Sequence, residues 1–162
     1  MIIDSTISGD HALAGGGIYN DAGATKTINN STFMRNAASY GGAILNNFTG
    51  QFGTIFVNNS TSIANNSFGE INNGGKMTIN NSTLSGSGFG IDFVNSGAAT
   101  FQNTIVAHNS EACSDNPVTS AGYTLSSDNT CNFDGPCDLN NTDPKTRTSG
   151  ELWRTDKGHP AA

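Results

Sequence analysis

Charged side chains are scarce in this chain, because only 12% of its 162 residues are Asp, Glu, Lys or Arg. The few charges are mostly acidic, with 13 carboxylates against seven Lys and Arg, and the formal net charge is -6. Nucleic-acid phosphates require a basic surface, so this balance argues against a nucleic-acid partner. The chain also has neither a long apolar run nor an amphipathic helical pattern, which argues against insertion into a membrane.

The two ends of the sequence differ from the sequence between them. No basic segment followed by an apolar one opens the chain, so no signal peptide is expected in it. Residues 145–162 are polar and basic and contain the only tryptophan, Trp153. We expect this tail to be disordered or foreign to the rest of the chain, and we interpret the chain as a fragment of a longer protein.

What the sequence does contain is an internal repeat. The run Ile-Asn-Asn-Ser-Thr-Phe at residues 28–33 recurs with small changes at 57–62 and 79–84, in shortened form at 101–105, and in degenerate form at 2–7. Self-similarity at a period of roughly 20 to 30 residues predicts a solenoid, in which stacked repeats bury a core that one repeat alone lacks.

A second motif follows the first in each repeat. It is a Gly-containing run that leads into an apolar residue and Asn, with copies at residues 15–20 and 41–46 and worn copies at 69–73 and 90–95. Both motifs are too short for helices and rich in β-branched residues. They therefore predict the strands of successive coils.

Aligning the repeats predicts columns of side chains that stack from coil to coil. Three columns are expected to be apolar and inward: Ile2, Ile28, Val57, Ile79 and Phe101; Ile7, Phe33, Ser62, Leu84 and Ile105; and Ile18, Ile44, Ile71 and Phe93. A fourth column is expected to hold inward amides that bond between coils at a bend: Asp4, Asn30, Asn59, Asn81 and Asn103. Ser62 interrupts its apolar column, and we expect Ile63 to fill the gap through a local β-bulge.

These two alternating motifs resemble the repeats of right-handed parallel β-helix proteins, in particular large bacterial secreted or cell-surface polypeptides of the polymorphic outer membrane protein type. The resemblance covers about residues 1–144. It implies an all-β fold, a single-stranded right-handed parallel β-helix, or β-solenoid, of about five coils with a loop-rich C-terminal segment. We expect coils over residues 1–111, a loop-rich closing segment of the same domain over 112–144, and the atypical tail over 145–162.

The resemblance implies a secreted or cell-surface location for the parent protein, and the cysteines agree with an oxidising compartment. Cys113 and Cys131 bracket a segment that a disulfide could clip into a hairpin, which leaves Cys137 as an odd third thiol. A zinc site is the rival interpretation, but the chain has no Cys-x-x-Cys motif and no His beside these cysteines. Neither a metal site nor a cofactor is predicted.

The repeat register places two acids, Glu70 and Asp92, in one column, each directly before an inward residue. Earlier coils have Gly17 and Ala43 at this position. Neighbouring coils lie about 4.8 Å apart, close to the separation of about 5 to 5.5 Å between the carboxyl groups of retaining glycosidases. Glu70 and Asp92 are therefore the candidate catalytic residues. The alternative is two solvated surface acids that happen to stack.

Two outward columns are candidates for ligand binding. One column gives the face beside the two acids some aromatic and apolar surface, as a sugar-binding face has, although an ordinary sheet face looks similar: Tyr19, Leu45, Asn72 and Val94. The other is a rank of threonines, the pattern of ice-binding solenoids, although β propensity on an exposed strand explains it as well: Thr6, Thr32, Thr61, Thr83 and Thr104.

No strong catalytic motif occurs in the chain, so the leading prediction is a non-catalytic extracellular module. Such an adhesin-like or stalk-like solenoid would present a face to polysaccharide or to a cell-surface glycan. The alternative is a carbohydrate-active hydrolase of the glycosidase type that uses Glu70 and Asp92, with ice binding as a minor alternative. Open solenoid ends expose unpaired strand edges, which predicts a possible homodimer.

Overall fold

The described part of the chain is an all-β structure without helices. The computed structural model describes residues 1–21, 23–46, 52–65, 67–86, 91–107 and 110–144. Within these ranges no helix is long and apolar enough to cross a membrane.

The strands form three parallel sheets. The first sheet contains β1 (Ile2–Ile3), β4 (Thr25–Asn29), β7 (Thr54–Asn58), β10 (Lys76–Asn80), β13 (Ala98–Gln102) and β16 (Thr119–Ser120). The second contains β2 (Thr6–Ser8), β5 (Thr32–Met34), β8 (Thr61–Ile63), β11 (Thr83–Ser85), β14 (Ile105–Ala107) and β17 (Leu125–Ser126). The third contains β3 (Ile18–Asn20), β6 (Ile44–Asn46), β9 (Ile71–Asn73), β12 (Ile91–Asn95) and β15 (Glu111–Asp115).

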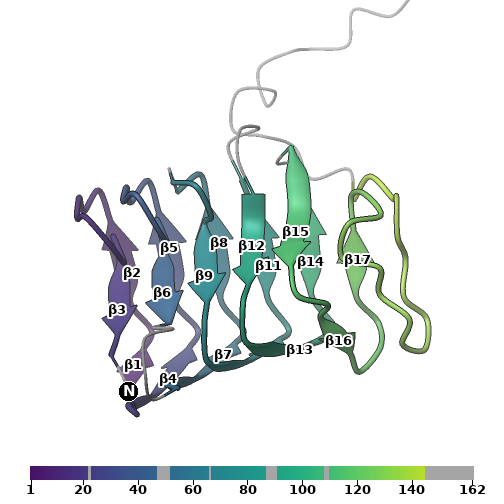
Figure 1. The fold of residues 1–162 in the computed structure, drawn as a ribbon, viewed down its shortest axis with the longest axis horizontal. Coiled ribbons are helices and arrows are strands. Elements are labelled where there is room, and N and C mark those ends of the chain that lie inside the picture. Colours follow the sequence, from purple (N-terminus) through teal and green to yellow (C-terminus); the bar gives the residue numbers. More distant parts are fainter. Residues whose placement is uncertain (22, 47–51, 66, 87–90, 108–109, 145–162) are drawn as a thin grey trace, which may run out of the picture.

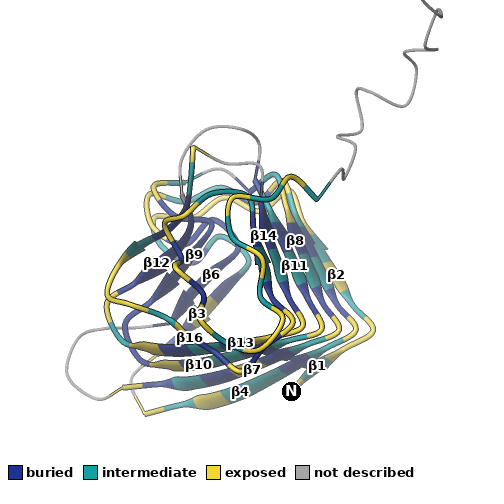
Figure 2. Cartoon of the chain, turned by 90° about the vertical axis from the view of Figure 1, so that its right-hand side faces the viewer, coloured by how far each residue is buried: buried dark blue, intermediate teal, exposed yellow. Residues whose placement is uncertain are grey.

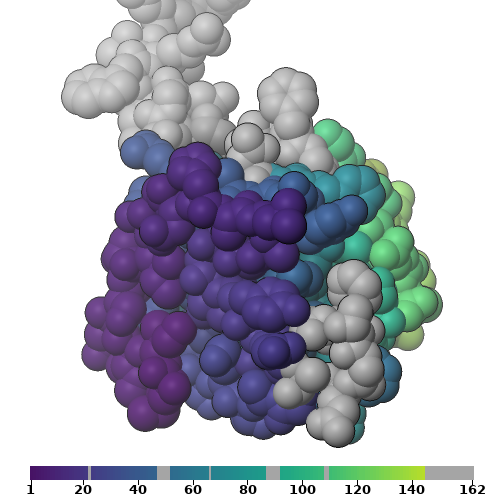
Figure 3. Space-filling model, turned by 60° about the vertical axis from the view of Figure 1, so that its left-hand side comes forward, coloured from purple at the N-terminus to yellow at the C-terminus, as the bar shows by residue number. Residues whose placement is uncertain are grey.

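Each coil gives one strand to each sheet and then returns to the first sheet, so strands three apart in the chain are neighbours. The coils follow one another along the long axis of the molecule, from β1 to β17 (Figure 1), and appear as successive bands on the surface (Figure 3). Viewed along that axis, the three sheets enclose a buried interior (Figure 2). The chain is thus a parallel β-solenoid of about five coils, as the repeats predict.

The first and third apolar columns are confirmed by the strand register. Ile28 lies opposite both Ile2 and Val57, and Ile79 lies opposite Phe101, in the first sheet. In the third sheet, the four predicted residues are also neighbours and are all buried. Phe93 and Phe101 meet edge to face, with ring centroids 5.0 Å apart, so the two columns pack on each other across the interior.

The second column is correct except at its last member. Leu84 lies opposite Val106, not Ile105, and Val106 is fully buried. Ile105 instead stands where we expected Thr104, opposite Thr83. Thr104 is 1% exposed, and its hydroxyl donates to the Gln102 carbonyl oxygen (2.9 Å). It therefore takes the position and the hydrogen bond that a serine has in the preceding coils.

That serine position is a column of its own. Each hydroxyl donates to the carbonyl two residues earlier, as Ser31 does to Asn29 (2.8 Å) and Ser82 does to Asn80 (2.7 Å). The same oxygens accept a backbone N–H from the preceding coil, as Ser60 Oγ does from Ser31 (3.1 Å). The column therefore satisfies the backbone at the corner between the first and second sheets.

The predicted Asn column exists, but it faces solvent rather than the interior. Its side chains bond from coil to coil, for example Asn30 Nδ2 to Asp4 Oδ1 (2.9 Å) and Asn103 Nδ2 to Asn81 Oδ1 (2.7 Å), while all five residues are exposed. All five have φ between 49° and 50°. Asn and Asp tolerate this left-handed conformation better than other non-glycine residues, so the tight corner, rather than the core, selects them.

A second Asn ladder, which the sequence analysis did not predict, lies in the interior. Asn20, Asn46, Asn73 and Asn95 end the strands of the third sheet and are at most 1% exposed. Their amides bond in series at 2.9, 2.8 and 3.0 Å. Asn46 Nδ2 also donates to the Gly53 carbonyl oxygen (3.2 Å), which ties the end of the third sheet to the start of the first.

The closing segment continues the stack before it becomes irregular. β15, β16 and β17 lie in the part of the chain where we expected mainly loops. After β17, the chain makes a further turn, and Leu139 forms a parallel bridge with Leu125. Phe133 is 4% exposed, and its ring centroid lies 5.5 Å from that of Phe101, so this segment covers the C-terminal end of the core.

Candidate functional site: a buried carboxyl pair

The two candidate acids are neighbours, as the repeat register predicts. Glu70 directly precedes β9, and Asp92 lies in β12. Because Phe93 pairs with Ile71 across these strands, the residues before them also lie side by side, one coil apart.

Both acids point into the solenoid. Glu70 is 1% exposed and Asp92 is fully buried. A Cβ atom added at Gly17, the first member of the column, would meet Phe33 Cδ1 at 3.0 Å, which shows that the column faces the interior. Strict alternation along a strand would turn Glu70 outward, but the chain bends at Glu70, and this bend lets both Glu70 and Ile71 face inward.

The Glu70 carboxylate occupies the gap in the second apolar column. Ser62 Oγ donates to Glu70 Oε1 at 2.5 Å and Asn65 Nδ2 donates to the same oxygen at 2.8 Å. Ser62 stays inward at 3% exposure, opposite Phe33, and Ile63 is 40% exposed. The expected bulge is therefore wrong: a carboxylate, rather than Ile63, fills the space that a small Ser leaves.

Burial and mutual repulsion favour the protonated forms of both acids. Burial raises the pKa of Glu70 from 4.5 to about 7, although hydrogen bonds from Ser62 and Asn65 and one with Asp92 partly offset it. Burial, together with the negative charges of Glu70 and Asp128, raises the pKa of Asp92 from 3.8 to about 10. At neutral pH, Asp92 thus keeps its proton and shares it with the Glu70 carboxylate.

This geometry differs from that of a retaining glycosidase. There the two carboxyl groups stand about 5 to 5.5 Å apart so that a sugar carbon fits between them. Here Glu70 and Asp92 are hydrogen-bonded to each other inside the core. Two polar side chains that sequence reasoning missed, Ser62 and Asn65, complete the cluster. The sequence feature that could have revealed the cluster is the pairing of two exceptions in one coil. Ser62 stands in an otherwise apolar column, and Glu70 stands where earlier coils have Gly or Ala.

The expected sugar-binding column is mostly covered. Tyr19 is 46% exposed, but Leu45, Asn72 and Val94 are 4%, 7% and 5% exposed. Glycine turns that precede the strands of the third sheet pack against this outer face. The Gly41 N–H donates to Asn72 Oδ1 (3.2 Å), and a Cβ atom at Gly69 would lie 2.5 Å from Val94 Cγ2. The expectation of an open column here is therefore wrong, except at Tyr19.

The threonine rank is shorter than expected. Thr6, Thr32, Thr61 and Thr83 are opposite one another, and Ile105 continues the rank in place of Thr104. The rank therefore ends at the fourth coil. Ice binding stays a prediction with this reduced surface.

Cys113 and Cys131, the pair singled out in the sequence, form a disulfide. It joins β15 to the irregular segment after β17 instead of closing a hairpin. Cys137 is free and exposed. Among the described residues, no group of three or more His, Cys, Asp or Glu side chains is arranged to hold a metal ion.

No protein-family model, curated protein or solved structure matches this chain.

Proposed function

We propose that the chain is a non-catalytic β-solenoid module that binds polysaccharide through the outer face of its first sheet. The observation that carries this proposal is a regular array of neutral hydrogen-bonding side chains around one exposed aromatic ring. We call this surface the Thr/Asn face. It consists of the outward residues Thr27, Phe56, Thr78, Thr100 and Thr119 in one column and Asn29, Asn58, Asn80 and Gln102 in the next.

The amides of the Thr/Asn face are held in place by one another. Asn58 Nδ2 donates to Asn29 Oδ1 (2.9 Å), and Asn80 Nδ2 donates to Asn58 Oδ1 (3.1 Å). An array that is already ordered loses little conformational entropy when a ligand binds. Its repeat along the solenoid axis, about 4.8 Å per strand, suits an extended chain of similar units better than a small compact ligand.

Phe56 gives this face an apolar centre. Its side chain is 40% exposed, and Thr27 and Thr78 flank it on the neighbouring strands. A sugar ring can stack its C–H face on the phenyl ring and direct its hydroxyl groups to the flanking Thr and Asn side chains. The two columns contain no charged residue, which favours a neutral polysaccharide.

A glycoside hydrolase is supported less well. A catalytic carboxylate must touch the substrate, whereas Glu70 and Asp92 lie inside the core and bond to each other. We expect purified protein to leave a panel of nitrophenyl glycosides and polysaccharides intact. Hydrolysis that is lost in both Glu70→Gln and Asp92→Asn, with unchanged unfolding temperatures, would instead support the hydrolase.

We further propose that the parent protein is secreted or displayed on a cell surface, in the manner of the bacterial repeat proteins that the motifs resemble. The disulfide supports an oxidising compartment, because such bonds are rare in reducing ones.

The test of the Thr/Asn face is a binding screen against neutral and charged polysaccharides by affinity electrophoresis, followed by calorimetry on any ligand found. Phe56→Ala is expected to weaken binding about tenfold, which corresponds to about 1.4 kcal/mol. Phe68→Ala is the matched control, because Phe68 is also exposed (63%) but lies in the connection between β8 and β9. Equal losses in both variants, or retention only of charged polysaccharides, would contradict the proposal.

A further inference from the structure

The amides of the Thr/Asn face form a ladder of fixed polarity. Asn80 Nδ2 donates to Asn58 Oδ1 (3.1 Å), and Asn58 Nδ2 donates to Asn29 Oδ1 (2.9 Å). The three residues are register neighbours in β10, β7 and β4, so the strand pairing sets their order. We call this row of three amides the face ladder. Along it, every donor points to the preceding coil and every acceptor to the following one.

Half of the hydrogen-bonding capacity of Asn58 is left over. A side-chain amide has two N–H groups and a carbonyl oxygen with two lone pairs, and the face ladder uses one of each. The Asn58 side chain forms no other hydrogen bond with a described residue, and it is half-buried rather than covered. It therefore offers a ligand one N–H and one lone pair, in directions that the ladder fixes.

Asn58 shares its outward surface with the exposed ring of Phe56. The two residues are two positions apart on β7, and the residues on either side of Phe56 are buried, so both side chains point away from the core. At the rise of a β-strand, their positions lie about 6.5 Å apart. A sugar ring stacked on Phe56 would thus carry one of its ring substituents over Asn58.

An acetamido substituent fits this place better than a hydroxyl group. Its N–H and its carbonyl oxygen point in opposite directions, as they do in the peptide units that bridge strands about 4.8 Å apart. The N–H can donate to the oxygen of one face-ladder amide while the carbonyl oxygen accepts from the next. A hydroxyl oxygen is a single atom, so it reaches the amide of only one strand. The acetamido methyl group also removes apolar surface of Phe56 from water.

We propose that the Thr/Asn face selects a neutral polysaccharide that carries N-acetyl groups. Phe56 stacks on a sugar ring of any kind, whereas Asn58, with a neighbouring amide of the face ladder, bonds to the acetamido group of that ring. Asn58 is therefore the residue that determines specificity. This inference rests on the proposed function, because it names the ligand class of the same face.

The test compares a chitin oligosaccharide with a cellulose oligosaccharide of equal length by calorimetry. Both have the same ring and linkage, and each ring of the first has an acetamido group where the second has a hydroxyl group. We expect the chitin oligosaccharide to bind about tenfold more tightly or better. Equal affinities would overturn this inference and leave the proposed function standing. If no neutral polysaccharide binds, the proposed function fails, and this inference with it.

A pair of variants assigns the preference to Asn58. Asn58→Ser is expected to reduce the preference for the chitin oligosaccharide to about twofold or less, while the affinity for the cellulose oligosaccharide changes by less than about threefold. Asn103→Ser is the matched control, because Asn103 is an exposed amide that donates to Asn81 Oδ1 (2.7 Å) but follows β13, two strands beyond β7. It should keep the full preference. An equal loss in both variants would overturn the role of Asn58.

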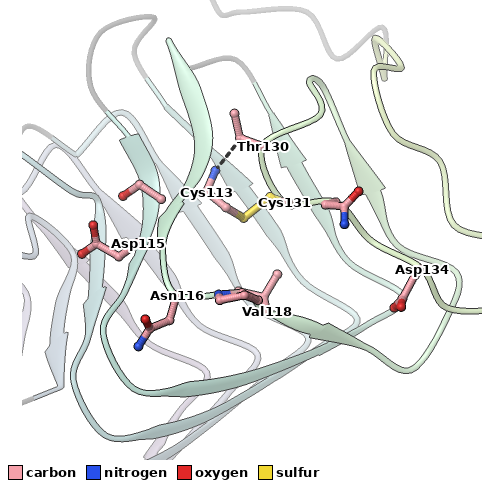
Figure 4. A pocket seen from close by; sticks show the side chains of 10 residues that line it. Cys113, Asp115, Asn116, Val118, Thr130, Cys131 and Asp134 are labelled. Carbon is pink, nitrogen blue, oxygen red and sulfur yellow. Dashed lines mark hydrogen bonds between the residues drawn. A yellow bond between two sulfur atoms is a disulfide. The ribbon is translucent and has the colours of Figure 1, made fainter.

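NMR of ¹⁵N-labelled protein locates the bound oligosaccharide. We expect saturable shift changes on β4, β7 and β10. Residues in the ranges 113–118 and 130–134 line a cleft of about 270 Å³ near the C-terminal end of the solenoid, where the Cys113–Cys131 disulfide lies (Figure 4). The cleft contains no residue of the face ladder, so it serves as the internal reference. Shift changes in the cleft instead of on the three strands would overturn the proposal.

Discussion

Two adjacent coils have the same backbone register and opposite interiors. In the coil of β4 to β6, Phe33 and Ala43 fill the corner between the second and third sheets with apolar atoms. In the next coil, Ser62 and Glu70 occupy the same two positions and fill it with a hydrogen-bonded carboxylate. The total size of the pair is similar, because a large and a small side chain have exchanged places. A β-solenoid therefore tolerates a polar layer where the side chains fill the same volume at the corner and the buried polar groups are hydrogen-bonded to one another.

The largest effect is expected when the apolar layer is emptied. Phe33→Ala removes a ring that is 1% exposed, so it should cost about 3 to 5 kcal/mol of unfolding free energy, measured by urea denaturation. Ser62→Ala, at the same position of the polar layer, should cost only about 1 to 3 kcal/mol, through the lost hydrogen bond to the buried Glu70 carboxylate and the weaker one that Ser62 accepts from Asn65. A Ser62→Ala cost equal to that of Phe33→Ala would contradict the comparison.

The second prediction converts the polar layer into the apolar one. Ser62→Leu alone should destabilise the protein by about 2 to 4 kcal/mol, because Leu overpacks against Glu70 and removes one of the two hydrogen-bond donors to its carboxylate. Ser62→Leu combined with Glu70→Ala copies the Phe33 and Ala43 arrangement and should recover at least about 1 kcal/mol of that loss. The measurement belongs near pH 5, where both Glu70 and Asp92 are protonated. If the double variant lost as much unfolding free energy as Ser62→Leu and Glu70→Ala lose together, the side chains at the two positions would not fill the same part of the core.

The third prediction concerns pH. Both acids have folded pKa values raised above their unfolded values, so ionising them costs free energy of unfolding. This cost is absent below about pH 4. It grows as pH rises toward about 7 for Glu70 and about 10 for Asp92. Asp92→Asn supplies a permanent neutral donor to Glu70. The variant should match the parent near pH 4 and exceed its unfolding free energy by about 1 to 3 kcal/mol near pH 9.

Thermal unfolding across this pH range measures the difference. The control is Asp138→Asn, which changes charge by the same amount at a carboxylate in the closing segment that accepts the backbone N–H of Thr124 and of Gly135. That variant should lose stability at neutral pH rather than gain it. A parallel pH profile for the parent and Asp92→Asn would show that the pair bears no ionisation cost.

The smallest effect is expected at the exposed Asn ladder, which recurs in both kinds of coil. Asn59 has φ of 50°, so Asn59→Ala should cost about 1 kcal/mol, mainly through backbone strain. Asn59→Gly should cost less, because glycine adopts this conformation freely. The shift in unfolding temperature measures both. A glycine variant that is less stable than the alanine variant would assign the ladder's contribution to its side-chain hydrogen bonds instead.

The repeat made the fold and most of the core predictable from sequence. A fixed period aligns Ile28 with Val57 and Ile79 whatever the connecting segments do, and strand pairing then follows. The exception, Thr104, has a simple cause. A threonine next to an apolar residue matches the motif, but in this coil Thr104 stands where the others have serine, and its hydroxyl bonds as a serine would.

The side-chain directions at the corners were not predictable from periodicity. Alternation between inward and outward holds only along extended strands, and it fails at Glu70, where the chain bends. The same limit applies to Asn30, which the corner turns outward, and to Leu45, which faces away from the core but is buried. The location of the acids could thus be read from the register, but their environment depended on bends and turns that repeat alignment does not describe.

The disulfide has a mechanical consequence. A solenoid whose coils touch only their neighbours would peel apart one coil at a time when it is pulled from its C-terminal side. The Cys113–Cys131 bond has a sequence separation of 18, so the enclosed chain cannot extend under load. At about 3.3 to 3.6 Å per residue, roughly 60 Å of contour length is withheld. In a force spectrometer, the increase in contour length on unfolding would include these residues only after the disulfide is reduced. While the disulfide is intact, it transmits the tension directly to β15.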